Sequence, residues 1–477
     1  MNEKIERGTF FLVSANGFSM VANYLIYIIL GKFLLGAEQL GVYAVVISLV
    51  SVIEMVLVKA VQQSVSKFVS ERPGSVQDVK LVALKLLVPL NIAMFAVYFA
   101  GSNLIASAFA DLSLAPYIQV ASFLFLLHPV FSVFMGCLNG LRRFVTQAKL
   151  RAFYALLKLA LVSGLAYSLS GLYGAIGGFV LASFFGMAVG FFLTRGKGAE
   201  PSQLSYKRFF AFLVPIIAMS ILTDLLVSID LFAVKALTGQ GSSTLAGYYI
   251  AASTIARVFP LVISAIAFIV FPLVSATTFR KDIEKTRFYI RNTLRYTLLA
   301  VLPFALLFAS TPKELVTIVY SLDYLPAASP LASLSIAFAA YTFFIILTTI
   351  IAASDRPKTA SLIAFVALAV SAVLNFVLVP VLLIEGAALS TLVASFAGLI
   401  LSAGFVLLRF KALVPLKSFS KILAASLLVY AISLGWPLEG LLLIGKYLIL
   451  LAVYAAALLL MKELSKKDLN IALNVVR

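Results

Sequence analysis

Several charged residues stand inside long apolar stretches of this sequence: Glu54, Lys59, Asp224, Asp230 and Arg257. A charged group inside hydrocarbon costs several kcal/mol unless it is paired or hydrated, so each of them is a functional hypothesis by default. A guanidinium can bind two phosphate oxygens at once, and a lysine ammonium can serve as a point charge for the same group. The basic members therefore suit an anionic ligand, and the acidic members suit a cation or a basic partner.

Each of these residues also has a structural interpretation. Arg257 either binds a ligand or pairs with Asp224, which lies at a comparable depth in its own stretch. Lys59, just over one helical turn after Glu54, either binds phosphate or extends toward the lipid headgroups. Asp230 is six residues after Asp224 and so faces another side of a helix, where a cation site, a pair with Arg257 and a hydrogen bond between the lobes are the alternatives.

Uncharged polar residues extend this set. Asn16 and Asn23 are seven residues apart, hence on one face of a helix, where they line a cavity or join two helices. Lys158 is interpreted as a residue that pairs structurally or extends toward the lipid headgroups, in preference to a ligand-binding role. His128, the one histidine, precedes a proline and is interpreted as a packing residue in preference to a proton relay.

The elements that position these residues are membrane-spanning helices. Of 477 residues, 62% are hydrophobic and 12% are charged, and the apolar runs are about twenty residues or longer, enough to cross the bilayer. Runs of this length without alternation exclude a β-barrel. The sequence predicts an all-α polytopic membrane protein with about fourteen spans, at 8–34, 40–66, 80–101, 114–140, 144–169, 172–194, 209–235, 245–274, 288–310, 328–353, 359–383, 386–408, 419–436 and 440–461.

The distribution of charge supports this count. With the N-terminus placed in the cytoplasm, 30 of the 37 basic residues fall in cytoplasmic segments, which predicts that both termini are cytoplasmic. The net charge of +18 is explained in this way, and no basic soluble domain exists that could bind nucleic acid. One cysteine and one histidine exclude a disulfide and a cysteine–histidine metal site, and we expect neither a metal nor a cofactor.

The chain also repeats itself. Gly174–Gly186 reads GAIGGFVLASFFG and Gly386–Gly398 reads GAALSTLVASFAG, and each opens a span-sized segment. The two lie six helices apart, so the halves share an orientation, as in transporters built from parallel repeats. This predicts an N-terminal lobe, a cytoplasmic linker, a C-terminal lobe, and two extra helices with a cytoplasmic tail, at 1–195, 196–208, 209–410 and 411–477.

Three segments resemble a known family. The eighth span reads GYYIAASTIARVFPLVISAIAFIVFPLVSATT from Gly247 to Thr278, the fourth ends GCLNGLRR at Gly136–Arg143, and LNFVLVPVLLIEGAALST occupies Leu374–Thr391. These segments resemble the polysaccharide transporters (O-antigen-type flippases) of the multidrug/oligosaccharidyl-lipid/polysaccharide exporter superfamily. Asn375 and Pro380 match the family pattern, and we interpret both as structural. Asp230 is similar to an acidic residue found late in the same span of the family.

The resemblance implies a flippase that moves a polyprenyl-diphosphate-linked oligosaccharide to the outer leaflet of the cell membrane by alternating access. Arg257 and Lys59 would bind the diphosphate, with Asn16 and Asn23 at the cavity wall. Asp224, Asp230 and Glu54 would form pairs or couple transport to H⁺ or Na⁺. Membrane lipids are the other expected partners, and no enzymatic step is needed. A cation-coupled multidrug antiporter of the same fold is the alternative, and a membrane glycosyltransferase has less support because extramembrane carboxylates are few.

Overall fold

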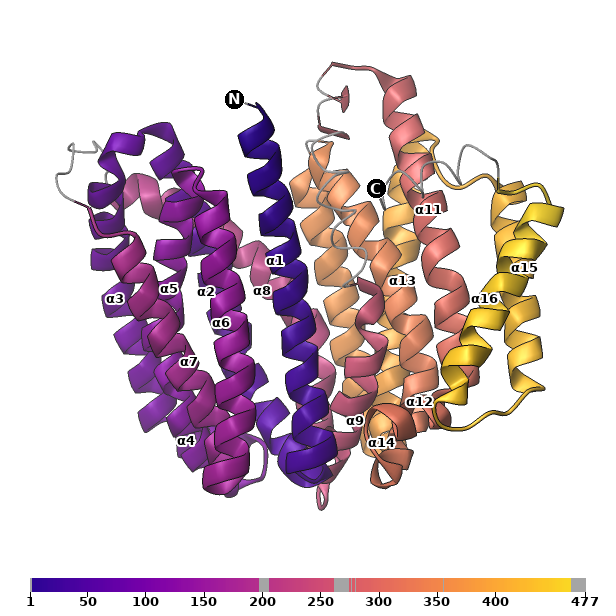
Figure 1. Cartoon of the computed structure of the whole chain (residues 1–477), viewed down its shortest axis with the longest axis horizontal. Helices are drawn as coiled ribbons and strands as arrows, with labels where there is room; N and C mark the ends of the chain where they lie inside the picture. The colour runs from indigo at the N-terminus through magenta and orange to yellow at the C-terminus, as the bar shows by residue number, and fades with distance from the viewer. Residues whose placement is uncertain are drawn as a thin grey trace. The chain divides into compact units, whose positions relative to one another are not determined.

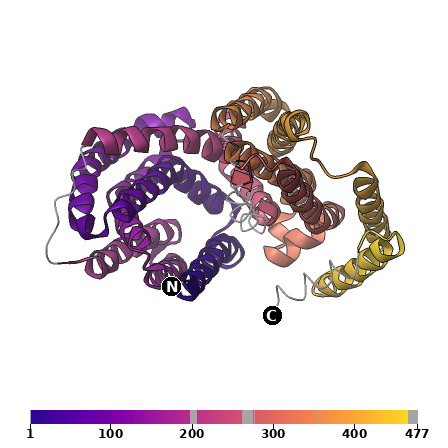
Figure 2. The same ribbon diagram turned by 90° about the horizontal axis from the view of Figure 1, so that it is seen from above.

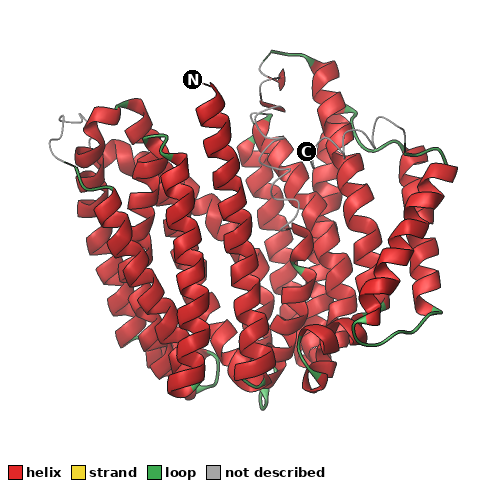
Figure 3. Cartoon of the chain, viewed as in Figure 1, coloured by secondary structure: helices red, strands yellow, loops and turns green. Residues whose placement is uncertain are grey.

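The computed structural model describes residues 2–196, 206–260, 274–275, 277–278, 280–354 and 356–464. Within these ranges, some side chains lie outside the described part, among them those of residues 2–10 and 53–56, which include Glu54. The described residues form helices joined by short connections, with no strand among them (Figure 3). The protein is therefore an all-helical chain, as its composition predicts.

The first compact unit comprises residues 1–250. Its helices are α1 (Asn2–Ile29), α2 (Ala37–Glu71), α3 (Val76–Ala100), α4 (Ser102–Ala108), α5 (Ala115–Gly140), α6 (Phe144–Leu165), α7 (Leu172–Leu193), α8 (Tyr206–Leu237) and the first part of α9 (Ser242–Ala256). Helix α2 packs against both α5 and α8, and α1 packs along α6 (Figure 1). The central position of α2 brings its polar residues next to those of several neighbours.

The second compact unit comprises residues 251–477. Its helices are α11 (Ile283–Ser310), α12 (Pro312–Val319), α13 (Ala328–Ala353), α14 (Pro357–Phe410), α15 (Leu416–Leu434) and α16 (Leu442–Leu460). Helix α13 packs mainly against α14, whereas α15 and α16 pair with each other beside α11 (Figure 2). The predicted lobes, with a boundary at 196–208, remain a prediction, since the compact units divide the chain within α9.

Eleven helices are long and apolar enough to cross a membrane, judged over the described residues. Side chains such as Phe376, Val381, Leu408 and Leu460 are between 72% and 84% exposed, which suits contact with lipid and not with water. Helix α14 is 54 residues long and holds two of the predicted spans. The protein is a multi-pass membrane protein, and the predicted spans match the observed helices to within a few residues at most ends.

The junction within α14 is a sharp break at Leu383, whose φ of 52° and ψ of −127° are not helical. In the first unit, Gly171 has φ 53° and ψ −105° and stands immediately before α7. Gly171 and Leu383 both lie three residues before the start of the repeated sequence motif, at Gly174 and Gly386. The two halves therefore share a backbone turn as well as a sequence pattern. Pro380 lies three residues before this break, while Asn375 donates hydrogen bonds to Ser371 within the helix.

Candidate functional site

Lys59 on α2 and Asp224 on α8 form an ion pair inside the first unit. The Lys59 ammonium lies 2.8 Å and 3.0 Å from the two carboxylate oxygens of Asp224. The Lys59 side chain is 42% exposed and that of Asp224 is 17% exposed. The sequence allowed Asp224 to pair with Arg257, and the structure instead places it against Lys59. Because an ammonium carries three N–H donors and the Lys59 side chain is partly exposed, Lys59 can bind a second acceptor while it stays paired with Asp224.

A second polar contact joins α1 and α6. The Lys158 ammonium donates a hydrogen bond of 3.1 Å to the side-chain oxygen of Asn23. The same ammonium lies 3.4 Å from the centre of the Phe179 ring on α7, close enough for a cation–π interaction. This gives Asn23 a partner that the sequence did not assign to it. Lys158, which is half-buried, thereby contacts both α1 and α7.

Arg151 is a further candidate, which the sequence interpretation counted among the basic residues of a cytoplasmic segment although it falls within the predicted span 144–169. It lies in the second turn of α6, seven residues before Lys158 and on the same face. Its guanidinium is 3.4 Å from the side-chain oxygen of Gln62 on α2. The shared spacing of seven in Asn16 and Asn23 and in Arg151 and Lys158 was the available signal.

Several buried polar side-chain atoms on α1 and α6 lack a hydrogen-bond partner among the described residues, and Asn16 Oδ1 and Arg151 Nε are two of them. Helices α1 and α6 are the first and fifth of the long helices, so they run in the same direction. The bond between Asn23 and Lys158 sets their register, which places Asn16 and Arg151 at a similar level one heptad earlier. Buried polar atoms normally have partners, so this level of the unit suits a polar or anionic ligand.

Asp230 and His128 have surroundings of a different kind. Asp230 on α8 is 1% exposed and accepts a hydrogen bond of 3.0 Å from the Tyr249 hydroxyl on α9. This bond joins two helices of the predicted C-terminal lobe, whereas the structural interpretation of Asp230 was a hydrogen bond between the lobes. His128 lies among the rings of Phe131, Tyr154 and Phe179, with centroid distances between 5.4 Å and 6.0 Å. This environment agrees with its interpretation as a packing residue.

Arg257 belongs to the second unit. It follows the last residue of α9, and its backbone N–H donates to the Ser253 carbonyl at 2.9 Å. Its guanidinium lies 5.5 Å from the centre of the Phe338 ring on α13. The residue thus stands at a one-residue turn within the predicted eighth span, and residues 258–260 after it are helical again. Phe271 and Pro272, which contributed to the family resemblance, lie outside the described residues.

A second network, at the ends of α8 and α9, was not predicted. Lys235 is 2% exposed, and its ammonium lies 2.6 Å from a carboxylate oxygen of Asp111, in the connection before α5. It also donates to the hydroxyls of Ser242 and Ser243 at the start of α9. The sequence identified Lys235 only as a basic residue outside the cytoplasmic segments. Its buried position makes it a structural tie between α8, α9 and this connection.

Helices α2 and α9 meet next to this network at matched glycines. A Cβ atom on Gly41 would lie 1.9 Å from the Ser243 carbonyl oxygen, and one on Gly247 would lie 1.8 Å from the Ala37 carbonyl oxygen. Each glycine therefore contacts the backbone four residues before the other glycine. The two helices begin with similar sequences, Gly41-Val-Tyr43 and Gly247-Tyr-Tyr249, and this reciprocal contact gives both glycines the same reason to lack a side chain.

The chain was compared with known proteins. No curated protein matches the sequence. Its fold is similar to that of the lipid II flippase MurJ in an inward closed conformation, with a TM-score of 0.80 at 16% identity over 94% of this chain and 98% of that one. It is also similar to an inward-facing multidrug resistance MATE transporter, with a TM-score of 0.67 at 16% identity over 82% and 94% of the two chains.

A third similar structure is a transporter of the same superfamily from Pyrococcus furiosus, described as having a binding pocket of reversed polarity. Its TM-score is 0.61 at 15% identity, over 86% of this chain and 95% of that one. At these identities the likeness establishes the fold of this superfamily. Residues 34–329, more than half of the chain, match the profile of a protein family described as polysaccharide biosynthesis protein. The chain belongs to this family of polysaccharide biosynthesis proteins.

Proposed function

We propose that this protein is a flippase that carries a polyprenyl-diphosphate-linked oligosaccharide from the cytoplasmic to the outer leaflet during assembly of a cell-surface glycan. The observation that carries the proposal is the charge of the membrane helices in the first unit. Lys59, Arg151 and Lys158 stand on α2 and α6, and Asp224 is the carboxylate paired with one of them. A lipid diphosphate has the opposite charge to this set, and the family description supports a role in polysaccharide synthesis.

The proposed roles follow from exposure and chemistry. The Lys59 side chain is 42% exposed, so it would bind the diphosphate and exchange between the ligand and Asp224. Arg257 would contribute a guanidinium, which binds phosphate oxygens in pairs. Asn16 and Asn23 would present amide groups along α1. Lys158 would hold Asn23 in place.

The proposed activity is transport of the lipid-linked oligosaccharide, in which no covalent bond is made or broken. The lipid tail would remain in the bilayer while the glycan crosses by alternating access, in the manner expected of two repeated lobes. We place both termini in the cytoplasm, on the strength of the basic residues in alternate connections. An ion gradient of H⁺ or Na⁺ or the membrane potential would supply the driving force.

A cation-coupled antiporter would need a carboxylate that is available to a cation. Asp224 is neutralised by Lys59 and Asp230 accepts from the Tyr249 hydroxyl. Among the described side chains of α1, from Phe11 onward, none is acidic. These contacts support an anionic substrate over a cationic one.

The direct test is a flipping assay in proteoliposomes with a fluorescent polyprenyl-diphosphate oligosaccharide and an impermeant quencher. Lys59→Met would leave Asp224 without its partner, so the informative variant is Lys59→Met with Asp224→Asn, which removes both charges and keeps the shape. We expect this variant to fold and to lose about 10- to 100-fold in flipping, the effect of one charge-assisted hydrogen bond. Lys59→Arg should retain most of the activity. Imposed gradients of H⁺ or Na⁺ in the same vesicles would identify the coupling ion.

The outcomes separate function from site. Flipping by the wild type that persists in the double variant would make Lys59 a structural residue and leave the function intact. Wild-type protein that moves no lipid diphosphate, but exports an organic cation in exchange for H⁺ or Na⁺, would replace the flippase with the antiporter. Arg257→Ala, measured in parallel, tests the guanidinium in the second unit.

A further inference from the structure

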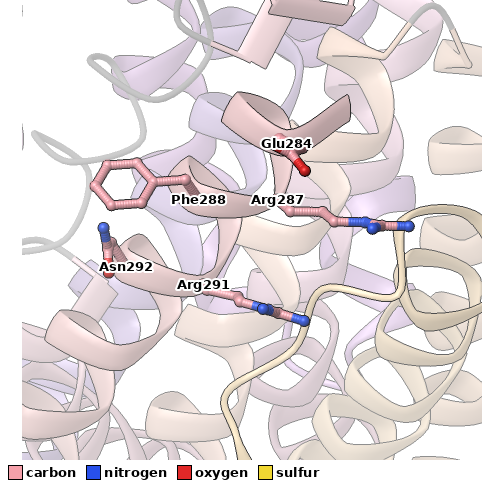
Figure 4. A pocket seen from close by; sticks show the side chains of 5 residues that line it. All are labelled: Glu284, Arg287, Phe288, Arg291 and Asn292. Carbon is pink, nitrogen blue, oxygen red and sulfur yellow. The ribbon is translucent and has the colours of Figure 1, made fainter. Parts of the chain in front are cut away.

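One face of α11 forms a cavity of about 310 Å³, lined by Glu284, Arg287, Phe288, Arg291 and Asn292. Their spacing of three and four residues places them all on one side of the helix. Figure 4 shows Arg287 and Arg291 extending in the same direction along one edge, with Phe288 and Asn292 along the other edge. The face thus has a cationic edge and an edge with an aromatic ring.

Both arginines are anchored by neutral acceptors. Arg287 Nε donates to the Phe410 carbonyl oxygen at 2.6 Å, and Arg291 donates from a terminal nitrogen to the Lys411 carbonyl oxygen at 3.1 Å. These carbonyls are at the C-terminal end of α14, where the helix dipole favours positive charge. A guanidinium has five N–H groups, so these contacts fix the two side chains and leave donors for a ligand.

Arg295, the next arginine on the same face of α11, has its charge compensated by an ion pair. Arg295 pairs with Glu463 at 2.9 Å, and the Glu463 carboxylate is almost completely buried. Arg287 and Arg291 form no ion pair with any described residue. Glu284 lines the cavity without pairing with either, so the cavity keeps a net positive charge.

The first unit provides an internal comparison. There, Gln77 and Lys80 on α3 donate to the Thr194 carbonyl at the end of α7, at 3.0 Å and 3.2 Å. In the first unit, the carbonyl at the end of the last helix of the repeat is thus bound by one amide, from Gln77, and one ammonium, from Lys80. The end of α14 is closed by the same number of side chains, but they carry one positive charge more and stand beside a cavity.

The surroundings of the cavity are those of a lipid interface. Phe288 is 61% exposed, and Ile283 and Leu408 are 56% and 84% exposed. Exposed apolar side chains at the end of a membrane helix lie against lipid, and basic pockets in this position recognise lipid headgroups. We propose that this face of α11 binds the headgroup phosphate of an anionic phospholipid of the cytoplasmic leaflet, with the phosphate on Arg287 and Arg291 and a chain against Phe288. This lipid is bound and not transported, so the proposal is independent of the flippase assignment.

The test uses the full-length protein in mild detergent, with binding of dioctanoyl phosphatidylglycerol followed by native mass spectrometry. Arg287→Gln with Arg291→Gln is compared with Arg280→Gln with Lys281→Gln, which removes the same charge from the neighbouring exposed turn. We expect the first variant to bind at least about tenfold more weakly and the second to bind like the wild type. Arg291→Gln alone, a change to an exposed side chain, serves if the double variant does not fold.

Each other outcome overturns the proposal. Equal weakening in both double variants would show attraction by general positive charge with no site. Wild-type binding that survives the loss of both arginines would remove the residues from any lipid site. Inorganic phosphate bound as tightly as the lipid would indicate a site for free phosphate, and binding of dioctanoyl phosphatidylcholine at the same affinity would exclude selectivity for an anionic lipid.

Discussion

Removing the buried ammonium of Lys235 should destabilise the first unit through Asp111. We consider Lys235→Met, which fills the space of the lysine stem and removes its charge. Breaking a buried ion pair by deleting one partner costs about 3–5 kcal/mol. Asp111 is 24% exposed and also accepts from the Ser113 backbone and hydroxyl at 3.0 Å and 2.6 Å. We therefore expect a smaller loss, about 2 kcal/mol, because two donors and some water remain for the carboxylate.

The reverse change should cost more. Asp111→Asn leaves the Lys235 ammonium buried without a counter-charge, with Ser242 and Ser243 as its remaining acceptors, and we expect a loss of about 3 kcal/mol. The double variant should lose less than the two singles together, with a coupling of roughly 1–3 kcal/mol. Unfolding in mild detergent with increasing denaturant, followed by circular dichroism, measures all four proteins. Losses that add to within about 0.5 kcal/mol would refute the ion pair as a stabilising unit.

The pH dependence gives a second test of the same pair. Burial alone would raise the pKa of Asp111, but the hydrogen bonds from Lys235 and Ser113 outweigh it, so the pKa lies below the ordinary carboxyl value. A lowered pKa means that this contribution is present above the unfolded-state value near 4 and disappears as the pH falls through the folded-state value. The wild type should therefore lose stability on acidification below about pH 4, and Lys235→Met should lose less over that range.

Three further predictions follow from the backbone and the topology. Gly41→Val should destabilise the protein by about 1–3 kcal/mol or more, seen as a lower thermal midpoint, because the new side chain would meet backbone atoms. Gly17→Ala is the control: no atom lies within 4 Å of the new Cβ, so this variant should be neutral or stabilising. Leu383→Gly should stabilise the chain by about 1 kcal/mol in a thermal melt, because glycine tolerates the positive φ of this break and leucine does not; a lower midpoint would contradict this reasoning. Gln240→Cys should react with an impermeant thiol reagent added outside intact cells, whereas Arg143→Cys should react only after permeabilisation. The native cysteine is buried, so it should contribute little labelling. The opposite pattern would invert the predicted topology.

The helical architecture was predictable because hydrocarbon imposes one requirement on the whole chain. Every backbone polar group must be paired inside the membrane, so the length of each apolar run translates directly into a helix. The ends at Gly140, Phe144 and Leu172 coincide with observed helix ends. The connection at 311–327, between two predicted spans, contains α12 and a short 3₁₀ segment. The sequence did not predict these elements, because their apolar run is too short to be recognised as a span.

The candidate site was predictable in type but not in pairing. Sequence identified Lys59 and Asp224 as charges that need partners, and this follows from the cost of charge in lipid. Their partnership depends on how α2 packs against α8, a contact between positions 165 residues apart that no local pattern encodes. Arg151 was misassigned because an arginine in the first turns of a helix is indistinguishable in sequence from one in the preceding connection.

The repeat suggests how the scaffold and the function of this chain can be distinguished. Features that recur in both halves serve the fold: the positive-φ turn at Gly171 and Leu383, and the closure of the last helix by side chains of α3 or α11. A charged feature without such a recurrence is a candidate for function where no ion pair or structural contact accounts for it. The basic face of α6 includes Arg151 Nε, a buried donor without a partner within the described structure, and the two arginines that close α14 carry one positive charge more than Gln77 and Lys80, which close α7. Both departures are cationic, and an anionic group is the one ligand chemistry that accounts for the two together.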